Sequence, residues 1–445
     1  MNPERQTIEK RLENMKNIYL QIGRIIDEIP EAIPESVRNL IRDKIVGDKD
    51  LKELMDGIDH HRPPRFLLVG RTGVGKSSLI NALTGCYLAQ VSDTESCTPD
   101  IQIYRCTDRG TTLMEILDTR GIAESDQINS KESAEEQLLN QVNEFSPDAA
   151  IFLLNCAHRD SVGEDAEYLK TVVQRYEALN HTTLPVVVVC TRADEVSPSR
   201  FKLPEEYPER KIDSIDEIVR NYKNVISNHG LRINSIIAVS SYIDWMNEAG
   251  EEVSVDTINN MSEDEKGKLK IAFDARYQIE ELRDILEHAI EDFQAKMGLR
   301  LALRLDELVK RLANHMTHIF AGISGIVALT PIPISDIYIL LIIQSLLVMI
   351  IAALSGREVN LDTAKEFVLS LFGVGGLGFV FRIAAQQASK LLNAIAPAAG
   401  SAISGGIATL GTESIGKAAT AYYIDNKPIE EAKARFKENN HNGGK

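Results

Sequence analysis

Residues 70–78, with the sequence GRTGVGKSS, have the types and the spacing that phosphate binding needs. They lie between an apolar strand predicted at 66–69 and a helix predicted from the apolar spacing at 79–83. The glycines let backbone N–H groups turn toward phosphate oxygens, Lys76 reaches the β- and γ-phosphates, and Ser77 offers its hydroxyl to Mg²⁺. The predicted phosphate-binding residues are Gly70, Arg71, Thr72, Gly73, Val74, Gly75, Lys76, Ser77 and Ser78.

A carboxylate stands at the end of the next predicted strand. Residues 114–117 are apolar and lead into the sequence DTRG at 118–121. The Asp118 carboxylate can hold Mg²⁺ through a water molecule, and Gly121 is small enough to approach the γ-phosphate. A DxxG sequence alone is weak evidence, and it gains its meaning from the phosphate loop that precedes it.

A polar loop at 91–100 separates these two motifs. Within it, Thr98 is the residue that we expect to close over Mg²⁺ when a γ-phosphate is present. Thr94 is the alternative, and a solvated turn without such a role also fits the composition. The predicted metal ligands are Ser77, Thr98 and Asp118, and the predicted catalytic residues are Lys76, Thr98 and Gly121.

The residues that would select a base follow a strongly apolar strand at 184–190 and read TRAD. The Asp194 carboxylate can accept hydrogen bonds from the ring N–H and the 2-amino group of guanine together, a pair that adenine lacks. Arg192 can lie along the purine face, and a turn at 240–241 can offer a backbone N–H to guanine O6. The predicted base-binding residues are Thr191, Arg192, Asp194, Ser240 and Ser241.

Taken in order, these five elements resemble those of translation-factor-class P-loop GTPases, nearest the Era-like, septin-like and interferon-inducible groups. The resemblance covers roughly residues 65–293. It implies an α/β fold with a mixed, mostly parallel six-stranded sheet between helices, GTP and GDP as ligands, and Mg²⁺ as cofactor. TRAD replaces the commoner NKxD of this class, as in several of its membrane-acting members, without changing the chemistry of the carboxylate.

One departure bears on the rate of hydrolysis. Where Ras-like enzymes place a Gln that orients the attacking water, this sequence has Ile122. The members that use K⁺ instead carry an Asn in the phosphate loop, and the matching residue here is Gly73. We therefore expect slow intrinsic hydrolysis that is accelerated by a partner, by a membrane, or by a homodimer formed across the nucleotide face.

Composition limits the class of protein. The chain has 445 residues, 44% hydrophobic and 26% charged, which predicts two or three folded domains. Its five cysteines include no CxxC pair, and its N-terminus lacks the apolar core of a signal peptide, so we expect a cytoplasmic protein. From Arg300 onward 14 Lys and Arg outnumber 11 Asp and Glu by 3, so the earlier residues carry −19 of the net charge of −16, and this acidic part argues against nucleic acid as a partner.

The elements around these motifs predict four segments. Residues 1–64 form a helical segment with apolar positions every three or four residues, broken at Pro30 and Pro34. The GTPase domain spans 65–298 and carries a polar insertion at about 242–275, which we interpret as a surface excursion. A helical domain at 299–425 follows, and a polar tail, expected to fray, spans 426–445.

The C-terminal helical domain is strongly apolar. Residues 319–354 carry one charge, Asp336, across two apolar segments separated by the sequence PIP at 331–333. The second segment, 337–354, has the minimum length that spans a bilayer, but a helix that is apolar on all sides also fits the centre of a soluble bundle. The region is similar to the C-terminal domain of uncharacterised function found on many bacterial Era-like GTPases, which implies association with the cytoplasmic face of a membrane.

The sequence therefore predicts a GTP-hydrolysing molecular switch with a membrane-associated helical domain and lipid as a further partner. Two alternatives stay open. One is a dynamin-like remodelling GTPase, and the other is a soluble assembly or stress GTPase whose helical domain binds protein. An ATPase is disfavoured by Asp194.

Overall fold

The computed structural model divides the chain into two compact units, which are described separately. The helical unit contains Lys10–Asp59 and Leu305–Lys445, and the nucleotide unit contains His60–Arg304. The predicted boundaries at 64 and 298 thus differ from those of the structure, and the N-terminal segment shares a unit with the C-terminal helices. The residues that the structure describes are 17, 21–25, 29, 31, 33–87, 90–91, 96–98, 101–108, 111–119, 131–157, 162–329, 336–372 and 397–442.

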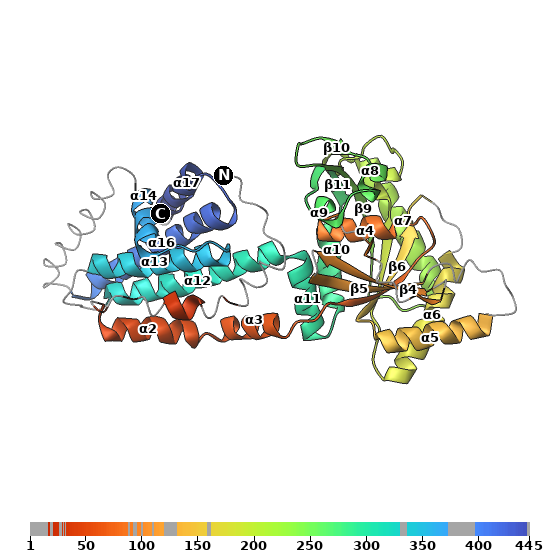
Figure 1. Ribbon diagram of the computed structural model, residues 1–445, viewed down its shortest axis with the longest axis horizontal. Coiled ribbons are helices and arrows are strands. Elements are labelled where there is room, and N and C mark those ends of the chain that lie inside the picture. Colours follow the sequence, from red (N-terminus) through yellow and green to blue (C-terminus); the bar gives the residue numbers. More distant parts are fainter. Residues whose placement is uncertain are drawn as a thin grey trace. The chain divides into compact units, whose positions relative to one another are not determined.

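The nucleotide unit is built on a mixed sheet (Figure 1). Its six main strands lie in the order β4-β5-β1-β6-β7-β8, all neighbours being parallel except β4 and β5. Two short strands, β2 and β3, pair with β4 and bring the sheet to eight. The predicted fold class is confirmed. The bounds are β1 Arg65–Val69, β2 Gln90–Val91, β3 Ser96–Thr98, β4 Ile101–Asp108, β5 Thr111–Thr119, β6 Ala149–Asn155, β7 Val186–Thr191 and β8 Ser235–Ala238.

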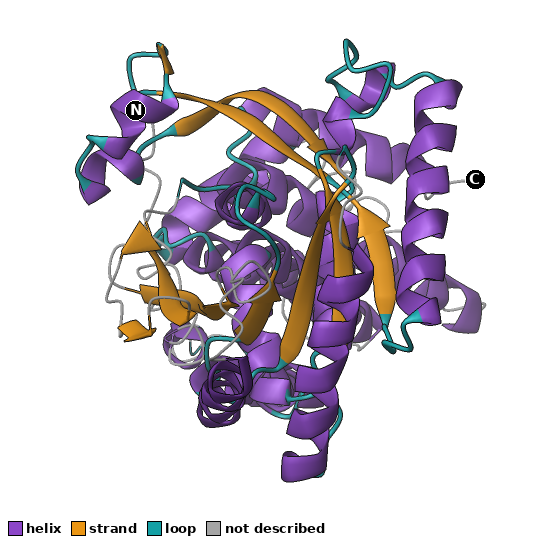
Figure 2. Cartoon of the chain, turned by 90° about the vertical axis from the view of Figure 1, so that its right-hand side faces the viewer, coloured by secondary structure: helices purple, strands orange, loops and turns teal. Residues whose placement is uncertain are grey.

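Helices cover both faces of this sheet (Figure 2). Neighbouring residues of β6 point to opposite sides, so Phe152 packs with α5, α6 and α7 while Leu153 packs with α4, α10 and α11. All six residues of β7 are buried, as expected for a parallel strand covered on both faces. The bounds are α4 Lys76–Thr84, α5 Lys131–Phe145, α6 Val162–Asn180, α7 Glu209–Asn228, α10 Ile279–Ala289 and α11 Phe293–Leu303.

The predicted insertion is a small folded subdomain rather than an irregular excursion. β9 (Ser240–Met246) pairs antiparallel with β10 (Glu252–Val253) and β11 (Lys270–Tyr277) in a second sheet. α8 (Val255–Asn259) and α9 (Glu263–Lys266) connect the last two strands. Trp245, Ile258 and Leu269 form its own apolar core. The apolar residues that alternate along β9 and β11 therefore pack against this small core.

The last helix of the nucleotide unit does not continue unbroken into the apolar C-terminal region. α10 ends at Ala289, and α11 begins at Phe293. Asp292 caps α11 by accepting a hydrogen bond from the N–H of Ala295 at 2.7 Å. A second break follows at Arg304, before α12.

The helical unit combines helices from both ends of the chain. α2 packs against α12, and His315 Nε2 on α12 lies 2.8 Å from Asp48 Oδ1, in the connection between α2 and α3. The predicted apolar positions Val37, Ile41 and Ile45 are buried. The bounds are α2 Glu35–Val46, α3 Lys49–Asp59, α12 Leu305–Leu329, α13 Asp336–Leu354, α14 Leu361–Leu371, α16 Pro397–Ala419, the π-helical η4 Thr420–Ile424 and α17 Ile429–Asn442.

α13 is the central helix of this unit. Residues 346–352 are all buried, and the helix packs against α12, α14 and α16. The Gln344 side chain donates to Thr412 Oγ1 at 3.2 Å, and that hydroxyl donates to Ser324 Oγ at 2.9 Å, which joins α13, α16 and α12. Among the described helices, α12 alone is long and apolar enough to cross a membrane, and 61% of its apolar stretch is buried.

The predicted polar tail is largely helical. α17 packs against α16, and the ring of Phe436 meets that of Phe372 edge-on at 4.9 Å between centroids. Ala432 and Phe436, one turn apart, are the buried residues of an otherwise charged helix. Two apolar residues are too few for the sequence pattern to indicate a packed helix. They are enough to hold α17 once α14 and α16 provide a surface for them to pack against.

The burial of two thiols predicts that the folded protein becomes less stable at alkaline pH. Burial raises the pKa of Cys106 from 9.0 to about 12 and that of Cys190 well above 9.0. The unfolded chain therefore releases protons above pH 9 that the folded chain retains, and the free energy of unfolding falls as the pH rises. At pH 10 the loss is on the order of 1 kcal/mol for Cys106, and Cys190 adds to it in the same direction.

Denaturant unfolding at pH 7 and pH 10 under reducing conditions measures this loss. The Cys106→Ala, Cys190→Ala double variant should lose less stability between these pH values than the unaltered chain. Cys86→Ala, which removes a thiol that is only half-buried, is the matched control. An equal fall in the double variant and the unaltered chain would contradict the assignment.

Candidate nucleotide-binding site

The phosphate loop leaves β1 and enters α4 as the sequence predicts. Gly75, at the helix N-cap, has φ of +101° and Gly73 has φ of +77°, a region that glycine enters without a Cβ clash. A Cβ on Gly70 would lie 2.9 Å from the Cβ of Leu153, so this glycine lets the loop approach β6. Ser77 and Ser78, in the first turn of α4, are exposed. Backbone N–H groups and the helix dipole therefore converge where an anion can bind.

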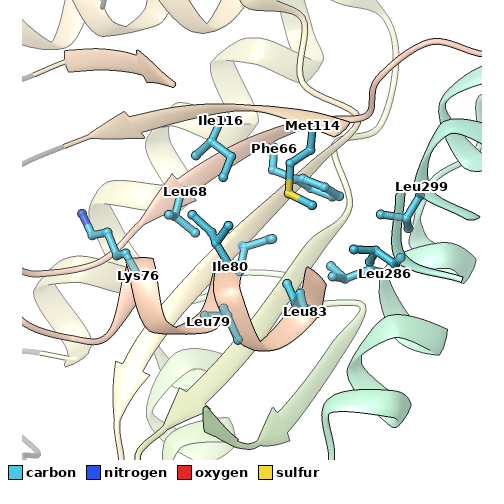
Figure 3. A pocket seen from close by; sticks show the side chains of 12 residues that line it. Phe66, Leu68, Lys76, Leu79, Ile80, Leu83, Met114, Ile116, Leu286 and Leu299 are labelled. Atoms are coloured by element: carbon cyan, nitrogen blue, oxygen red, sulfur yellow. The ribbon is translucent and has the colours of Figure 1, made fainter. Parts of the chain in front are cut away.

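An apolar layer fixes the inner face of α4 (Figure 3). A small pocket lies under the helix, with Leu79 and Leu83 on one side and Phe66 and Met114 from the sheet on the other. Leu286 and Leu299 come from α10 and α11, and Lys76 stands at the far end of the same lining. The lysine is thus carried by a helix whose apolar side chains are packed against the sheet and against α10 and α11.

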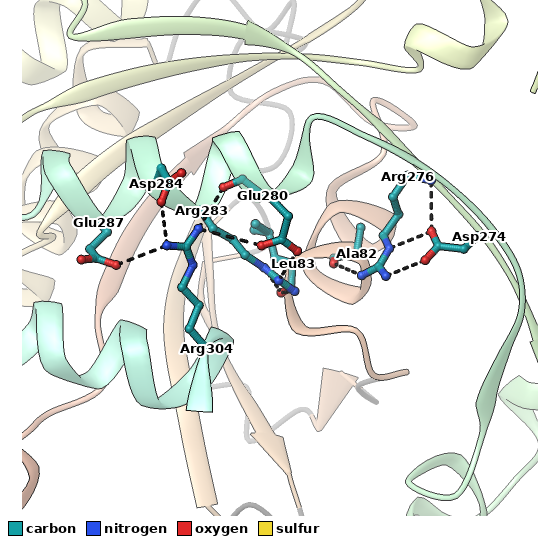
Figure 4. A network of polar contacts seen from close by, with 9 residues as sticks. All are labelled: Ala82, Leu83, Asp274, Arg276, Glu280, Arg283, Asp284, Glu287 and Arg304. Carbon is teal, nitrogen blue, oxygen red and sulfur yellow. Dashed lines mark hydrogen bonds and ion pairs between the residues drawn. The ribbon is translucent and has the colours of Figure 1, made fainter. Parts of the chain in front are cut away.

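Two arginines hold the far end of α4 (Figure 4). Arg276 of β11 donates to the carbonyl of Ala82 at 3.2 Å, and Arg283 of α10 donates to the carbonyl of Leu83 at 2.9 Å through Nε. The last carbonyls of a helix have no partner within it, so these arginines supply one. α4 is therefore tied at its C-terminal end to both the small sheet and α10.

Lys76 is paired with the predicted metal-binding carboxylate. Its Nζ lies 2.5 Å from Asp118 Oδ1, and both side chains are largely buried. Asp118 stands near the end of β5, next to β1, as the sequence predicts. Ser77 and Asp118 are oxygen donors of the kind that Mg²⁺ prefers, and they flank the phosphate loop. The residues present fit the cofactor that the family resemblance implies.

The base-binding turn is tied directly to the phosphate loop. Thr191, at the end of β7, donates from its hydroxyl to the carbonyl of Val74 at 2.6 Å. Arg192, with φ of +60°, donates to the carbonyl of Gly73 at 2.8 Å. The two halves of the predicted site therefore belong to one rigid region of the nucleotide unit. The Arg192 guanidinium thus binds the phosphate loop, and its contact with the purine face stays a prediction.

Asp194 lies in η1 (Ala193–Glu195), and its side chain is held on both oxygens. Ser240 donates to Oδ1 at 3.1 Å, and Lys202 Nζ lies 2.8 Å from Oδ2. Asp194 is 7% exposed. Ser240 is the first residue of β9 and is fully buried, so the predicted turn at 240–241 is the start of a strand. Its hydroxyl orients the carboxylate, a contact that the sequence did not predict.

Other predicted residues have a less complete description. Gly121, Ile122 and Thr94 lie outside the described residues. Thr98 lies in β3, paired with β4, where the sequence predicted a polar loop. Arg71 forms a two-point contact with Asp165 of α6 at 2.9 and 3.1 Å, a contact that no sequence motif predicts.

Two protein families match the chain. Residues 65–192 match the family described as 50S ribosome-binding GTPase, and residues 294–440 match a Domain of unknown function, DUF697. The first of these regions contains the phosphate loop, Asp118 and Thr191. The second contains most of the described C-terminal helices, α17 included.

Individual GTPases are similar to this chain. GTPase Der of Buchnera aphidicola subsp. Schizaphis graminum is 30% identical over 216 residues, which is 47% of this chain and 42% of Der. The chain therefore spans less than half the length of that relative. The bacterial dynamin GTPase LeoA from ETEC is a distant likeness, 12% identical with a TM-score of 0.34 over 98% of this chain and 66% of LeoA.

A shorter relative is matched over most of its length. The probable GTP-binding protein EngB of Streptococcus mutans is 30% identical over 157 residues, which is 34% of this chain and 72% of EngB. Because the family match falls on a unit whose fold places the phosphate loop beside Asp118 and Asp194, and because the chain covers 72% of EngB at 30% identity, the chain belongs to the P-loop GTPases.

Proposed function

We propose that the protein is a molecular switch that binds GTP, hydrolyses it to GDP and phosphate, and passes the change to its helical unit. The observation that carries this proposal is the Asp194 carboxylate, held by Ser240 and joined to the phosphate loop through Thr191 and Arg192. Of the common purines, guanine offers the N–H and amino pair that such a carboxylate accepts. The site thus reads the base and binds the phosphates with one connected set of residues.

Each residue near the phosphates has a distinct part. The loop amides and Lys76 bind the β- and γ-phosphate oxygens, which requires Lys76 to exchange Asp118 for phosphate when the nucleotide enters. Ser77 and Asp118 are then available to Mg²⁺, which supplies charge compensation on the phosphate oxygens. Thr98 and Gly121 are the residues that we propose to become ordered by the γ-phosphate, and their loss of that contact on hydrolysis is the switch.

The dilute protein should hydrolyse GTP slowly. Ile122 offers no polar group to orient the attacking water, and Gly73 takes the place of the asparagine of the K⁺-dependent members. Single-turnover hydrolysis, measured over a hundredfold range of protein concentration, should show a rate that rises with concentration if a homodimer across the nucleotide face completes the site. Fast turnover by dilute protein free of lipid would overturn the proposal.

We further propose that the helical unit associates with the cytoplasmic face of a membrane. Support comes from the length and apolarity of α12 and from exposed apolar residues near the facing ends of α12 and α13, namely Ile326, Leu329 and Tyr338. Fractionation of cells that express the full chain tests this. The proposal predicts a membrane pellet that releases the protein in detergent.

A soluble switch whose helical unit binds protein is the second candidate. It is favoured by the complete burial of residues 346–352 in α13, which then need no lipid. Recovery of the chain in the supernatant at low salt would select this candidate. A dynamin-like remodeller would instead form nucleotide-dependent oligomers on liposomes, which sedimentation with GTP, with GDP and without nucleotide distinguishes.

A further inference from the structure

Lys211, in the first turn of α7, is a buried lysine in the nucleotide unit. It has no exposed surface, and it occupies the helix face on which Ile215, Ile218 and Tyr222 pack into the core. Burial of an ammonium group is unfavourable unless other groups replace its water. Burial lowers the pKa of Lys211, while the charge of Asp194 acts in the opposite direction. The position therefore calls for partners that hold the charged form.

Those partners all belong to one short segment. Lys211 Nζ donates to the carbonyl of Asp194 at 2.8 Å and to that of Phe201 at 2.9 Å, with the carbonyl of Pro198 at 3.5 Å. The ring of Tyr207 lies beneath the ammonium, 4.4 Å from its centroid. The segment from 194 to 201 begins at the residue that recognises the base. Lys211 thus joins the two ends of this segment at a single point.

The same segment delivers a second contact to the base-binding carboxylate. Lys202 follows Phe201 directly, and its Nζ reaches Asp194 Oδ2 at 2.8 Å. Ser240, the first residue of β9, donates a hydrogen bond from its hydroxyl to Asp194 Oδ1. Because Lys211 fixes the backbone carbonyls at both Asp194 and Phe201, it sets the direction in which the Asp194 carboxylate leaves the main chain. A side chain that has no reach to the nucleotide therefore controls the geometry of base recognition.

We propose that Lys211 is a positioning residue for guanine, which acts by holding the 194–201 segment so that both Asp194 oxygens face the base. This inference rests on the proposed binding of GTP at the same turn. It predicts that the 2-amino group of guanine loses its hydrogen bond to Asp194 when Lys211 is replaced. The phosphate contacts, which come from the loop at 70–78, should be retained.

The test compares guanosine diphosphate with inosine diphosphate, which lacks only the 2-amino group. The full chain should bind the guanosine nucleotide about 10- to 100-fold more tightly, the effect of one charge-assisted hydrogen bond. In Lys211→Met this ratio should fall below about 3-fold, because guanosine diphosphate loses both of its bonds to Asp194 whereas inosine diphosphate loses only the bond from its ring N–H. Lys223→Met, the same change at an exposed position of α7, is the control and should keep the ratio.

Each outcome has one meaning. An equal loss of affinity for both nucleotides, or an unchanged ratio, would show that Lys211 only stabilises the fold and would overturn the inference. A full chain that does not prefer guanosine diphosphate would instead overturn the proposed function. If Lys211→Met does not fold, Lys211→Gln keeps an N–H donor without the charge. Its preference for guanosine over inosine diphosphate should be weaker than that of the unaltered chain but should not vanish.

Discussion

Replacing Asp194 with asparagine should reduce the affinity for GTP by about 10²- to 10³-fold, the equivalent of about 3–4 kcal/mol. The carboxylate accepts two hydrogen bonds from guanine, whereas an asparagine amide would place its NH₂ against the donors of the base. The fold should tolerate the change, since Ser240 can still donate to the remaining oxygen and the half-exposed Lys202 can turn to water. Equilibrium binding of a fluorescent GTP analogue measures the loss.

Xanthosine triphosphate provides the complementary result. Xanthine has a carbonyl in place of the guanine 2-amino group, so Asp194→Asn should bind it more tightly than the unaltered chain does. Glu195→Gln is the matched control because it removes the adjacent carboxylate, which pairs with Arg192, and leaves the Asp194 side chain unchanged. Unchanged GTP affinity in Asp194→Asn, or tighter binding of ATP than of GTP by the full chain, would remove the basis of the guanine assignment.

The sequence predicted those parts of the site that are formed by consecutive residues or that directly follow a strand. The loop at 70–78 has one backbone path that satisfies its glycines and the start of α4, and the structure has that path. Asp118 and Asp194 follow apolar strands whose parallel pairing brings their ends to one edge of the sheet. Short-range chemistry and the rules of parallel sheets were therefore sufficient for this part of the site.

The residues that support the site could not be found in the same way. Lys202 and Lys211 reach Asp194 only after the chain has turned through a segment with no motif of its own. One signal was present: Lys211 lies four residues before Ile215 and seven before Ile218, on the apolar face of α7. A lysine in such a position is either solvated through its long side chain or bound to buried acceptors, and the sequence alone does not distinguish the two.

The helical unit was predicted less well for a related reason. Its helices were expected from apolar spacing, and α2, α3, α12 and α13 are present. Their partners are distant in the chain, however, and spacing carries no information about which apolar faces meet. The break between α10 and α11 is marked by Asp292, whose side chain caps α11 by accepting a hydrogen bond from the N–H of Ala295.

Replacing Lys76 with methionine should impair both the binding and the hydrolysis of GTP. The affinity for GTP and the single-turnover rate should each fall by about 10²- to 10³-fold, since a preorganised cation is lost from the β- and γ-phosphate oxygens. The variant also leaves Asp118, buried and previously paired at 2.5 Å, without its cation, so its unfolding free energy should fall.

The double variant Lys76→Met, Asp118→Asn separates these two effects. Removing the carboxylate charge should restore much of the unfolding free energy that Lys76→Met loses, because no unpaired charge then stays buried. Hydrolysis should stay absent, since both the phosphate-binding cation and the Mg²⁺ carboxylate are missing. Thermal unfolding and single-turnover assays on the same preparations give the two readouts. Activity that returns together with stability would mean that Lys76 serves the fold and not the phosphates.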